Sequence, residues 1–237
     1  MIVVGRLHPF FGSLTEGMVE KNFLKDICQK YHYEEPQLPV VGAVAASMQG
    51  RILSDVRAGR AGFVCGETGK SFGKEGKGET VGVCMTLGPG IDALQEDYLR
   101  RGLLSEAYMV ETIASELLLR AYPLWNEWIR EREPRHVKRY YFPGGGAERP
   151  LEALPELIQA LKAPVVCTEA YCLLPKKSVA FYAELTEDAD AVCEGICASC
   201  GNADCPNRMD SQQRACFTAD MADRPFTYGY RRIFGLD

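Results

Sequence analysis

The chain has 237 residues, of which 46% are hydrophobic and 25% are charged, and its formal net charge is −5. This size and composition suit a soluble globular protein with one large domain, or a domain with an appendage. The acidic balance argues against non-specific nucleic-acid binding, because such binding draws its affinity from neutralising phosphates. No apolar run of about 18 residues predicts a membrane span and no secretory signal opens the sequence, so we expect a cytoplasmic protein.

Helical and strand-like patterns mix along the first half of the chain. Apolar residues recur at helical spacing over residues 17–31, which predicts an amphipathic helix. The short apolar run at residues 40–46 is typical of a buried strand. The glycine- and lysine-rich segment at residues 62–78 predicts a mobile loop, and residues 80–87 predict a strand.

The second half begins with a Gly-Pro-Gly sequence at residues 88–90, which ends the preceding strand. A long helix is predicted over residues 103–130, with a break or kink at Pro123. Another helix opens at Pro150, since proline suits a first helical turn. Two further strands are predicted at residues 165–168 and 178–185. The mixture indicates an α+β domain over residues 1–188, with a cysteine-rich segment over residues 189–237 packed on it.

The strongest chemical signal is a group of four cysteines, Cys193, Cys197, Cys200 and Cys205, followed by Pro206. Thiolates spaced this closely can converge on one metal centre, and soft sulfur ligands favour an iron–sulfur cluster or zinc. The Cys-Pro ending and the lack of paired Cys-x2-Cys spacings favour an iron–sulfur cluster, of the 4Fe-4S type, with zinc as the alternative. Unligated thiols and the Cys-x3-Cys-x2-Cys motif of radical S-adenosylmethionine enzymes are further alternatives.

Other residues that often carry chemistry point to no site of their own. Cys216 is a spare candidate metal ligand. The remaining cysteines lie in apolar or strand-like contexts and are predicted to be small core residues: Cys28, Cys65, Cys84, Cys167 and Cys172. The histidines are scattered and share no spacing with carboxylates or cysteines. Residues 66–71 lack the first glycine of a phosphate-binding loop.

Three further segments carry motifs in a fixed order. Residues 86–92 read Thr-Leu-Gly-Pro-Gly-Ile-Asp and precede a helix with Ser-Glu-Leu at residues 115–117. Residues 142–152 read Phe-Pro-Gly-Gly-Gly-Ala-Glu-Arg-Pro-Leu-Glu, and residues 168–179 read Thr-Glu-Ala-Tyr-Cys-Leu-Leu-Pro-Lys-Lys-Ser-Val. In this order the segments resemble the activation domain of vitamin B12-dependent methionine synthase, especially its short, cysteine-rich relatives. The resemblance spans roughly residues 80–208.

The resemblance implies a twisted, mostly antiparallel sheet with flanking helices. It also implies reductive reactivation of a corrinoid (cobalamin) cofactor on a partner methyltransferase such as methionine synthase, with S-adenosylmethionine as the possible methyl donor. The positions that align with the family's S-adenosylmethionine site, or lie nearest to its residues, are Arg139, Tyr140, Pro143, Gly144, Gly145, Gly146, Glu169 and Tyr182. The glycines allow close approach of the backbone to a ligand, and Glu169 suits an ammonium or sulfonium group.

Two alternative functions remain beside reactivation of a corrinoid. The chain is alternatively a non-catalytic module that holds zinc structurally and docks to a corrinoid or folate-pathway protein. A redox enzyme with another substrate on the same scaffold is the other possibility. The structural alternative for the glycine turn is a plain surface loop, and for Glu169 it is a helix-cap or strand-end role.

Overall fold

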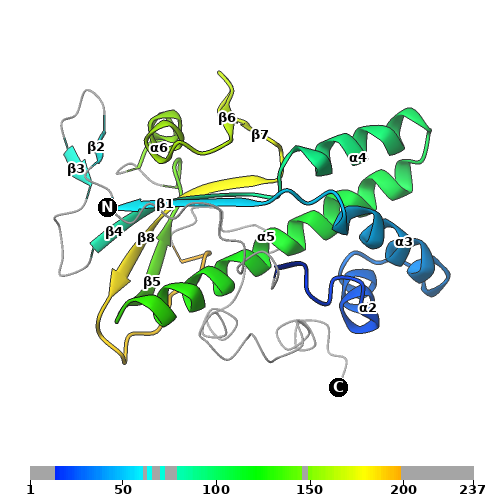
Figure 1. Cartoon of the computed structure of the whole chain (residues 1–237), viewed down its shortest axis with the longest axis horizontal. Coiled ribbons are helices and arrows are strands. Elements are labelled where there is room, and N and C mark those ends of the chain that lie inside the picture. Colours follow the sequence, from blue (N-terminus) through cyan, green and yellow to red (C-terminus); the bar gives the residue numbers. More distant parts are fainter. Residues whose placement is uncertain (1–13, 61–62, 66–69, 73–78, 146–148, 199–237) are drawn as a thin grey trace.

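The computed structural model describes residues 14–60, 63–65, 70–72, 79–145 and 149–198. Its centre is a four-stranded sheet whose neighbouring strands all pair antiparallel, in the order β1-β4-β8-β5 (Figure 1). The strands are β1 (Asp55–Arg60), β4 (Glu79–Thr86), β8 (Ser178–Thr186) and β5 (His136–Tyr141). The predicted α+β class with a mostly antiparallel sheet is therefore confirmed for the described residues.

Strand β8 lies inside the sheet and has apolar side chains on both faces. Phe181 and Ala183 point to one face, while Ala180 and Tyr182 point to the other, as the two-residue period of a strand requires. A strand covered on both faces must be apolar on both, which explains why its polar positions are so few.

Helix α5 (Leu104–Arg132) lies across the first face of the sheet (Figure 1). Helices α3 (Leu38–Gln49) and α4 (Pro89–Arg100) pack against α5, and α2 (Lys21–Lys30) packs against α3. A short 3-10 helix, η1 (Glu35–Gln37), precedes α3. The main core forms between these helices and the sheet. At its centre, the Phe181 ring packs edge-to-face against Trp125 and Tyr140, at centroid distances of 5.9 and 5.4 Å.

The second face carries α6 (Ala153–Leu161) and the small hairpin of β6 (Val166–Cys167) and β7 (Leu173–Leu174), above the sheet in Figure 1. Leu154, Leu157 and Ile158 of α6 pack on Cys84, Ala180 and Tyr182 of the sheet, forming a second, smaller core. One further antiparallel pair joins β2 (Phe63–Cys65) to β3 (Lys70–Phe72).

Residues 40–46 correct one prediction, because they belong to helix α3 rather than to a strand. The buried side chains of α3 are Val41, Val44, Ala45 and Met48, which follow the helical spacing of three and four residues. A run of seven apolar residues fits the two-residue period of a strand as well as the 3.6-residue period of a helix. Met48, which extends the helical spacing, lies beyond this run.

The predicted helices at residues 17–31 and 103–130 and the predicted strands at residues 80–87, 165–168 and 178–185 are found close to those bounds, whereas the helix expected to open at Pro150 begins at Ala153. Helix α4 and strands β1, β5 and β7 were not predicted. Helix α5 continues through Pro123 from Leu104 to Arg132. Within the segment 62–78, the structure places the short β2–β3 pair, whereas the prediction was a loop throughout; the rest of that segment lies outside the described residues. Among the helices described, none has the length and apolar character that a membrane span needs.

Candidate functional site

Of the four predicted metal ligands, the described residues include Cys193 and Cys197, while Cys200 and Cys205 lie outside them. Cys193 is 1% exposed and belongs to the main core. Burial raises the pKa of its thiol, although a hydrogen bond from the Gly195 backbone acts in the opposite direction. Cys197 is half-buried. Within the described ranges, no group of three or more His, Cys, Asp or Glu side chains is arranged to hold a metal.

The cysteine-rich segment begins alongside the edge strand β5. The Glu194 backbone N–H donates to the Lys138 carbonyl oxygen at 2.8 Å, and Arg139 Nε donates to the Glu194 carboxylate at 2.6 Å. The His136 ring nitrogen Nε2 lies 2.7 Å from the Ala191 carbonyl oxygen. His136 therefore contributes a contact between β5 and the chain that precedes Cys193.

Arg139 and Tyr140, which were predicted to bind S-adenosylmethionine, point to opposite faces of β5. Tyr140 is 0% exposed, and its hydroxyl group donates to the Tyr122 carbonyl oxygen at 3.4 Å. Burial raises the pKa of Tyr140 well above its ordinary value. The Arg139 guanidinium group is partly exposed and is paired with Glu194. Of the two, only Arg139 is accessible to a ligand.

Tyr182 is also a core residue, since it is 2% exposed and packs under α6. Beside it the Arg149 guanidinium carbon lies 3.6 Å from the centroid of the Tyr141 ring, a close cation–π contact. The Tyr141 hydroxyl donates to Glu184 at 2.7 Å. Burial acts to raise the pKa of Glu184, but hydrogen bonds from Tyr141 and Lys138 outweigh it, so this pKa lies below its ordinary value.

The predicted glycine turn follows β5. Gly144 has a φ of 83°, in the region that favours glycine, and its N–H donates to the Arg149 carbonyl oxygen at 2.8 Å. Gly145 closes the turn onto Phe142 at 2.9 Å, and Pro143 and Gly145 are half-buried. Gly146 lies outside the described residues. These hydrogen bonds and the positive φ of Gly144 explain the conformation of the turn without a ligand.

Glu169 is exposed in the turn between β6 and β7. The neighbouring Thr168 makes the bonds that close this turn: its hydroxyl oxygen accepts from the Cys172 N–H at 3.0 Å, and its own N–H donates to the Cys172 carbonyl oxygen at 2.9 Å. Glu169 is thus accessible to a ligand, but it lies on a different element from Arg139.

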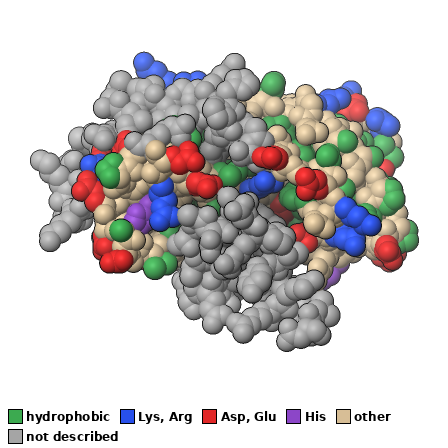
Figure 2. Space-filling model, turned by 60° about the horizontal axis from the view of Figure 1, so that its bottom comes forward, with side chains coloured by type: hydrophobic (Ala, Val, Ile, Leu, Met, Phe, Trp, Pro, Cys, Tyr) green, Lys and Arg blue, Asp and Glu red, His purple; other side chains and the backbone are tan. Residues whose placement is uncertain are grey.

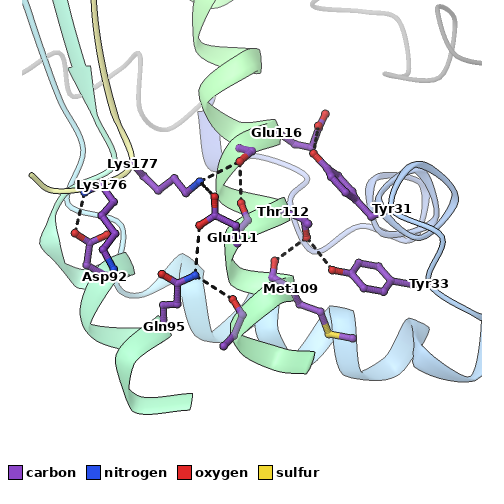
Figure 3. A network of polar contacts seen from close by, with 12 residues as sticks. Tyr31, Tyr33, Asp92, Gln95, Met109, Glu111, Thr112, Glu116, Lys176 and Lys177 are labelled. Atoms are coloured by element: carbon purple, nitrogen blue, oxygen red, sulfur yellow. Dashed lines mark hydrogen bonds and ion pairs between the residues drawn. The ribbon is translucent and has the colours of Figure 1, made fainter. Parts of the chain in front are cut away.

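Two of the three motif segments, the one at residues 86–92 with its Ser-Glu-Leu helix and the one at residues 168–179, meet at one place, which we call the segment junction. Ser178 Oγ and Thr86 Oγ1 are hydrogen-bonded at 2.8 Å, and the Lys176 N–H donates to the Asp92 carboxylate at 2.8 Å. The Lys177 ammonium group donates to Ser115 Oγ at 3.0 Å. Figure 3 shows the Lys176 and Lys177 contacts, which join the start of β8 to α4 and α5.

Two buried charged groups extend the segment junction along α5. Lys177 also forms an ion pair with Glu111, which accepts a hydrogen bond from Gln95 at 3.3 Å (Figure 3). Glu116 is 1% exposed; it forms an ion pair with Lys30 and accepts from the Tyr31 hydroxyl at 2.7 Å. The Oε2 atom of Glu116 is buried, and no described residue forms a hydrogen bond with it.

Sequence reasoning singled out Glu116 only as part of a motif and missed its buried ion pair. The sequence held a signal for the burial of Glu116, because Ile113 and Leu117, three residues before it and one after it on α5, are apolar and buried. On the face of the molecule in Figure 2, the described acidic and basic side chains lie next to one another rather than in separate patches.

The structure confirms part of the prediction for the remaining cysteines. Cys28 and Cys84 are buried core residues, as expected, whereas Cys167 is half-buried and Cys172 is exposed. The latter two lie on the small β6–β7 hairpin. The side chain of Cys65 lies outside the described residues. None of the six cysteines whose side chains are described forms a disulfide.

The chain matches no protein-family model, and it matches no curated protein.

Proposed function

We propose that this chain delivers electrons to a corrinoid cofactor carried by a partner methyltransferase, and that it belongs to the methionine synthase activation-domain fold. The observation that carries the proposal is the segment junction. Motif residues that lie 60 or more positions apart, such as Thr86 and Ser178 (|i−j| of 92) or Ser115 and Lys177 (|i−j| of 62), are hydrogen-bonded to each other. These contacts support the proposal because they make the two motif segments parts of one structural unit.

The electron relay is assigned to a cluster held by cysteines of the C-terminal segment. When bound, an iron–sulfur cluster supplies single electrons at low potential. The chain's own described residues contribute the base of this segment, because Lys138 and Arg139 of β5 hold Glu194. The predicted ligand set is Cys193, Cys197, Cys200 and Cys205.

Binding of S-adenosylmethionine has weaker support. Tyr140 and Tyr182 are enclosed in the two cores, so neither offers its ring or hydroxyl group to a ligand. Arg139, the glycine turn and Glu169 remain as accessible groups. We keep methyl transfer from S-adenosylmethionine as a proposal that calorimetry tests directly: absence of binding at millimolar ligand would remove methyl transfer and leave electron delivery.

The test of electron delivery uses the full chain purified without oxygen. We expect iron and acid-labile sulfide in the protein, with a broad absorbance near about 400 nm that bleaches on reduction. The reduced protein is then mixed with cob(II)alamin, and the loss of the cob(II)alamin electron paramagnetic resonance signal is followed. Cys197→Ser serves as the control, which we expect to lack the absorbance. A wild-type chain without iron rules the relay out.

The alternative is a non-catalytic module that holds zinc and docks to a corrinoid or folate-pathway protein. The burial of Tyr140 and Tyr182 favours it, since a chain that only docks needs no S-adenosylmethionine site. Elemental analysis of the same preparation separates the two functions, because zinc without sulfide indicates the module.

A further inference from the structure

The start of helix α5 exposes two large apolar side chains at the end of the molecule where α4 turns into α5 (Figure 1). Leu104 is 67% exposed and Tyr108 is 54% exposed. The two side chains lie next to each other, because residues four positions apart are neighbours on a helix surface. Exposed apolar side chains that adjoin one another mark interaction surfaces more often than isolated ones do.

Tyr33 extends this apolar surface beyond α5. Its ring packs edge-to-face against the ring of Tyr108, with the centroids 6.3 Å apart. Its hydroxyl oxygen lies 3.1 Å from Thr112 Oγ1, one helical turn further along α5. These contacts hold both tyrosine rings in place, so a partner that packs on them immobilises few further side chains. We call Tyr33, Leu104 and Tyr108 the α5 patch.

Two acidic residues flank the α5 patch on one side. Glu34 and Glu35 directly follow Tyr33 in the chain, and both are exposed. In Figure 3 the Tyr33 side chain approaches α5 from the side opposite to Gln95 of α4. The acidic side of the patch therefore lies away from α4.

Two basic residues flank the α5 patch on the other side. Arg100 and Arg101 lie where α4 ends, four and three residues before Leu104. Their side chains are 76% and 59% exposed. Each guanidinium group contacts the Asp97 carboxylate at 3.4 Å. Because one carboxylate is shared between two guanidinium groups, this side of the patch keeps a net positive charge.

We propose that the α5 patch binds a second copy of this chain in a dimer with twofold symmetry. A twofold axis brings the same patch of both copies together in opposite orientations. The acidic side of one copy then meets the basic side of the other, while Leu104 and Tyr108 pack against their counterparts. A partner of uniform charge would instead meet a like charge on one of the two sides.

The proposed dimer is weak, because three apolar side chains and a charged rim on each copy make a contact smaller than a standard interface. Its formation needs neither a metal nor a corrinoid. The inference is therefore independent of the proposed function.

The first experiment measures the dimer dissociation constant of the full chain by analytical ultracentrifugation, from about 1 µM to about 1 mM protein. A reducing buffer excludes disulfides between copies. Tyr108→Ser should raise the dissociation constant about 10-fold, because it removes a central aromatic contact. Val166→Ser is the matched control and should leave it unchanged, since Val166 is 65% exposed but lies on the β6–β7 hairpin, on the other face of the sheet. A wild-type chain that stays monomeric throughout this range overturns the proposal.

The second experiment tests the orientation of the two copies by exchanging charges. An acidic variant carries Arg100→Glu and Arg101→Glu. A basic variant carries Glu34→Lys and Glu35→Lys. Each variant alone has like charges on both sides of the α5 patch, so its dissociation constant should rise about 10-fold above that of the wild type. Mixed in equal amounts, the two variants should form a heterodimer, because every acidic side then meets a basic one.

A further control separates the α5 patch from general attraction between oppositely charged proteins. Adding Tyr108→Ser to both charge variants should abolish the heterodimer, and circular dichroism shows that each variant is folded. If folded charge variants do not associate when mixed, or if they still associate with Tyr108→Ser in both, the proposed dimer is wrong.

Discussion

Gly88 lies where the first motif segment turns from β4 into α4, and its backbone leaves no room for a side chain. Its φ is 85°, and a Cβ atom there would lie 2.3 Å from the Leu53 carbonyl oxygen. Gly90 is restricted in the same way, since its Cβ would lie 2.2 Å from the Arg51 carbonyl oxygen. Sterics alone therefore explain why glycine occupies both positions of this motif, without any contact to a ligand.

Gly88→Ala should lower the free energy of unfolding by about 3 kcal/mol or more, because backbone strain and the carbonyl clash add. Gly102→Ala is the matched control: its φ is 74°, but no atom lies within 4 Å of the added Cβ. The control should lose only about 1 kcal/mol, the cost of the backbone conformation. Urea denaturation measures the free energy of unfolding of both variants. Equal decreases would show that the backbone near Leu53 shifts to relieve the clash.

The ion pair between Lys30 and Glu116 leads to a prediction at the same scale. Lys30→Met leaves Glu116 charged and buried without its cation, which should cost about 3 kcal/mol of unfolding free energy. Glu116→Gln should cost less, since it removes the buried charge and keeps an acceptor for Tyr31. Chemical denaturation of both variants checks the order, and a larger loss for Glu116→Gln would contradict it.

At the scale of elements, α5 contains Pro123 at an interior position, where a proline removes a backbone donor and crowds the preceding turn. Pro123→Ala should therefore raise the free energy of unfolding by about 1 kcal/mol. Pro89 offers the control, because it lies in the first turn of α4, where no donor is needed. Pro89→Ala should instead lower stability by about 0.5 kcal/mol. Thermal unfolding of the two variants should shift in opposite directions.

The sheet explains why the two core faces differ in their tolerance of charge. Glu184 on the second face is held by Lys138 and Tyr141 at the open edge of the sheet beyond α6. On the first face, the neighbouring β8 residues Phe181 and Ala183 belong to the main apolar core. Neighbouring positions of β8 thus differ: Glu184 forms an ion pair at the accessible edge of the sheet, and Ala183 is buried in the core.

At the scale of the whole molecule, burial of several thiols and phenols makes stability sensitive to alkaline pH. Burial, helped by the nearby Asp55 carboxylate, raises the pKa of Cys84 from 9.0 to about 12. In the window between these values, an unfolded chain releases the thiol proton while the folded chain keeps it. The unfolded state then binds fewer protons, so the free energy of unfolding must fall as the pH rises.

Cys84 alone should contribute a loss of about 1.4 kcal/mol per pH unit in that window. Cys84→Ala should make the fall with pH shallower by this amount, although its stability at neutral pH is lower. Cys172→Ala, at an exposed thiol, is the control and should leave the slope unchanged. Urea midpoints measured across the window test the prediction, and identical slopes for Cys84→Ala and the wild type would refute it.

Local pattern determined much of the architecture without reference to the rest of the chain. The alternation at residues 178–185 predicted β8, the Gly-Pro-Gly sequence predicted the end of β4, and the helical stretch at residues 103–130 predicted α5. These features could be predicted because the side-chain period of a strand or helix is visible in consecutive residues. Glycine frees the backbone and proline restricts it at their own positions, so the ends of elements are visible locally as well.

Tertiary contacts decided the rest. Helix α3 forms because Val41, Val44 and Met48 face the same core, and that core is built from helices and strands far along the chain. The same reason buries Tyr140 and Cys193 in the main core. Burial is set by which distant segments approach one another, and for that reason the roles of these side chains follow from the fold rather than from their neighbours in the sequence.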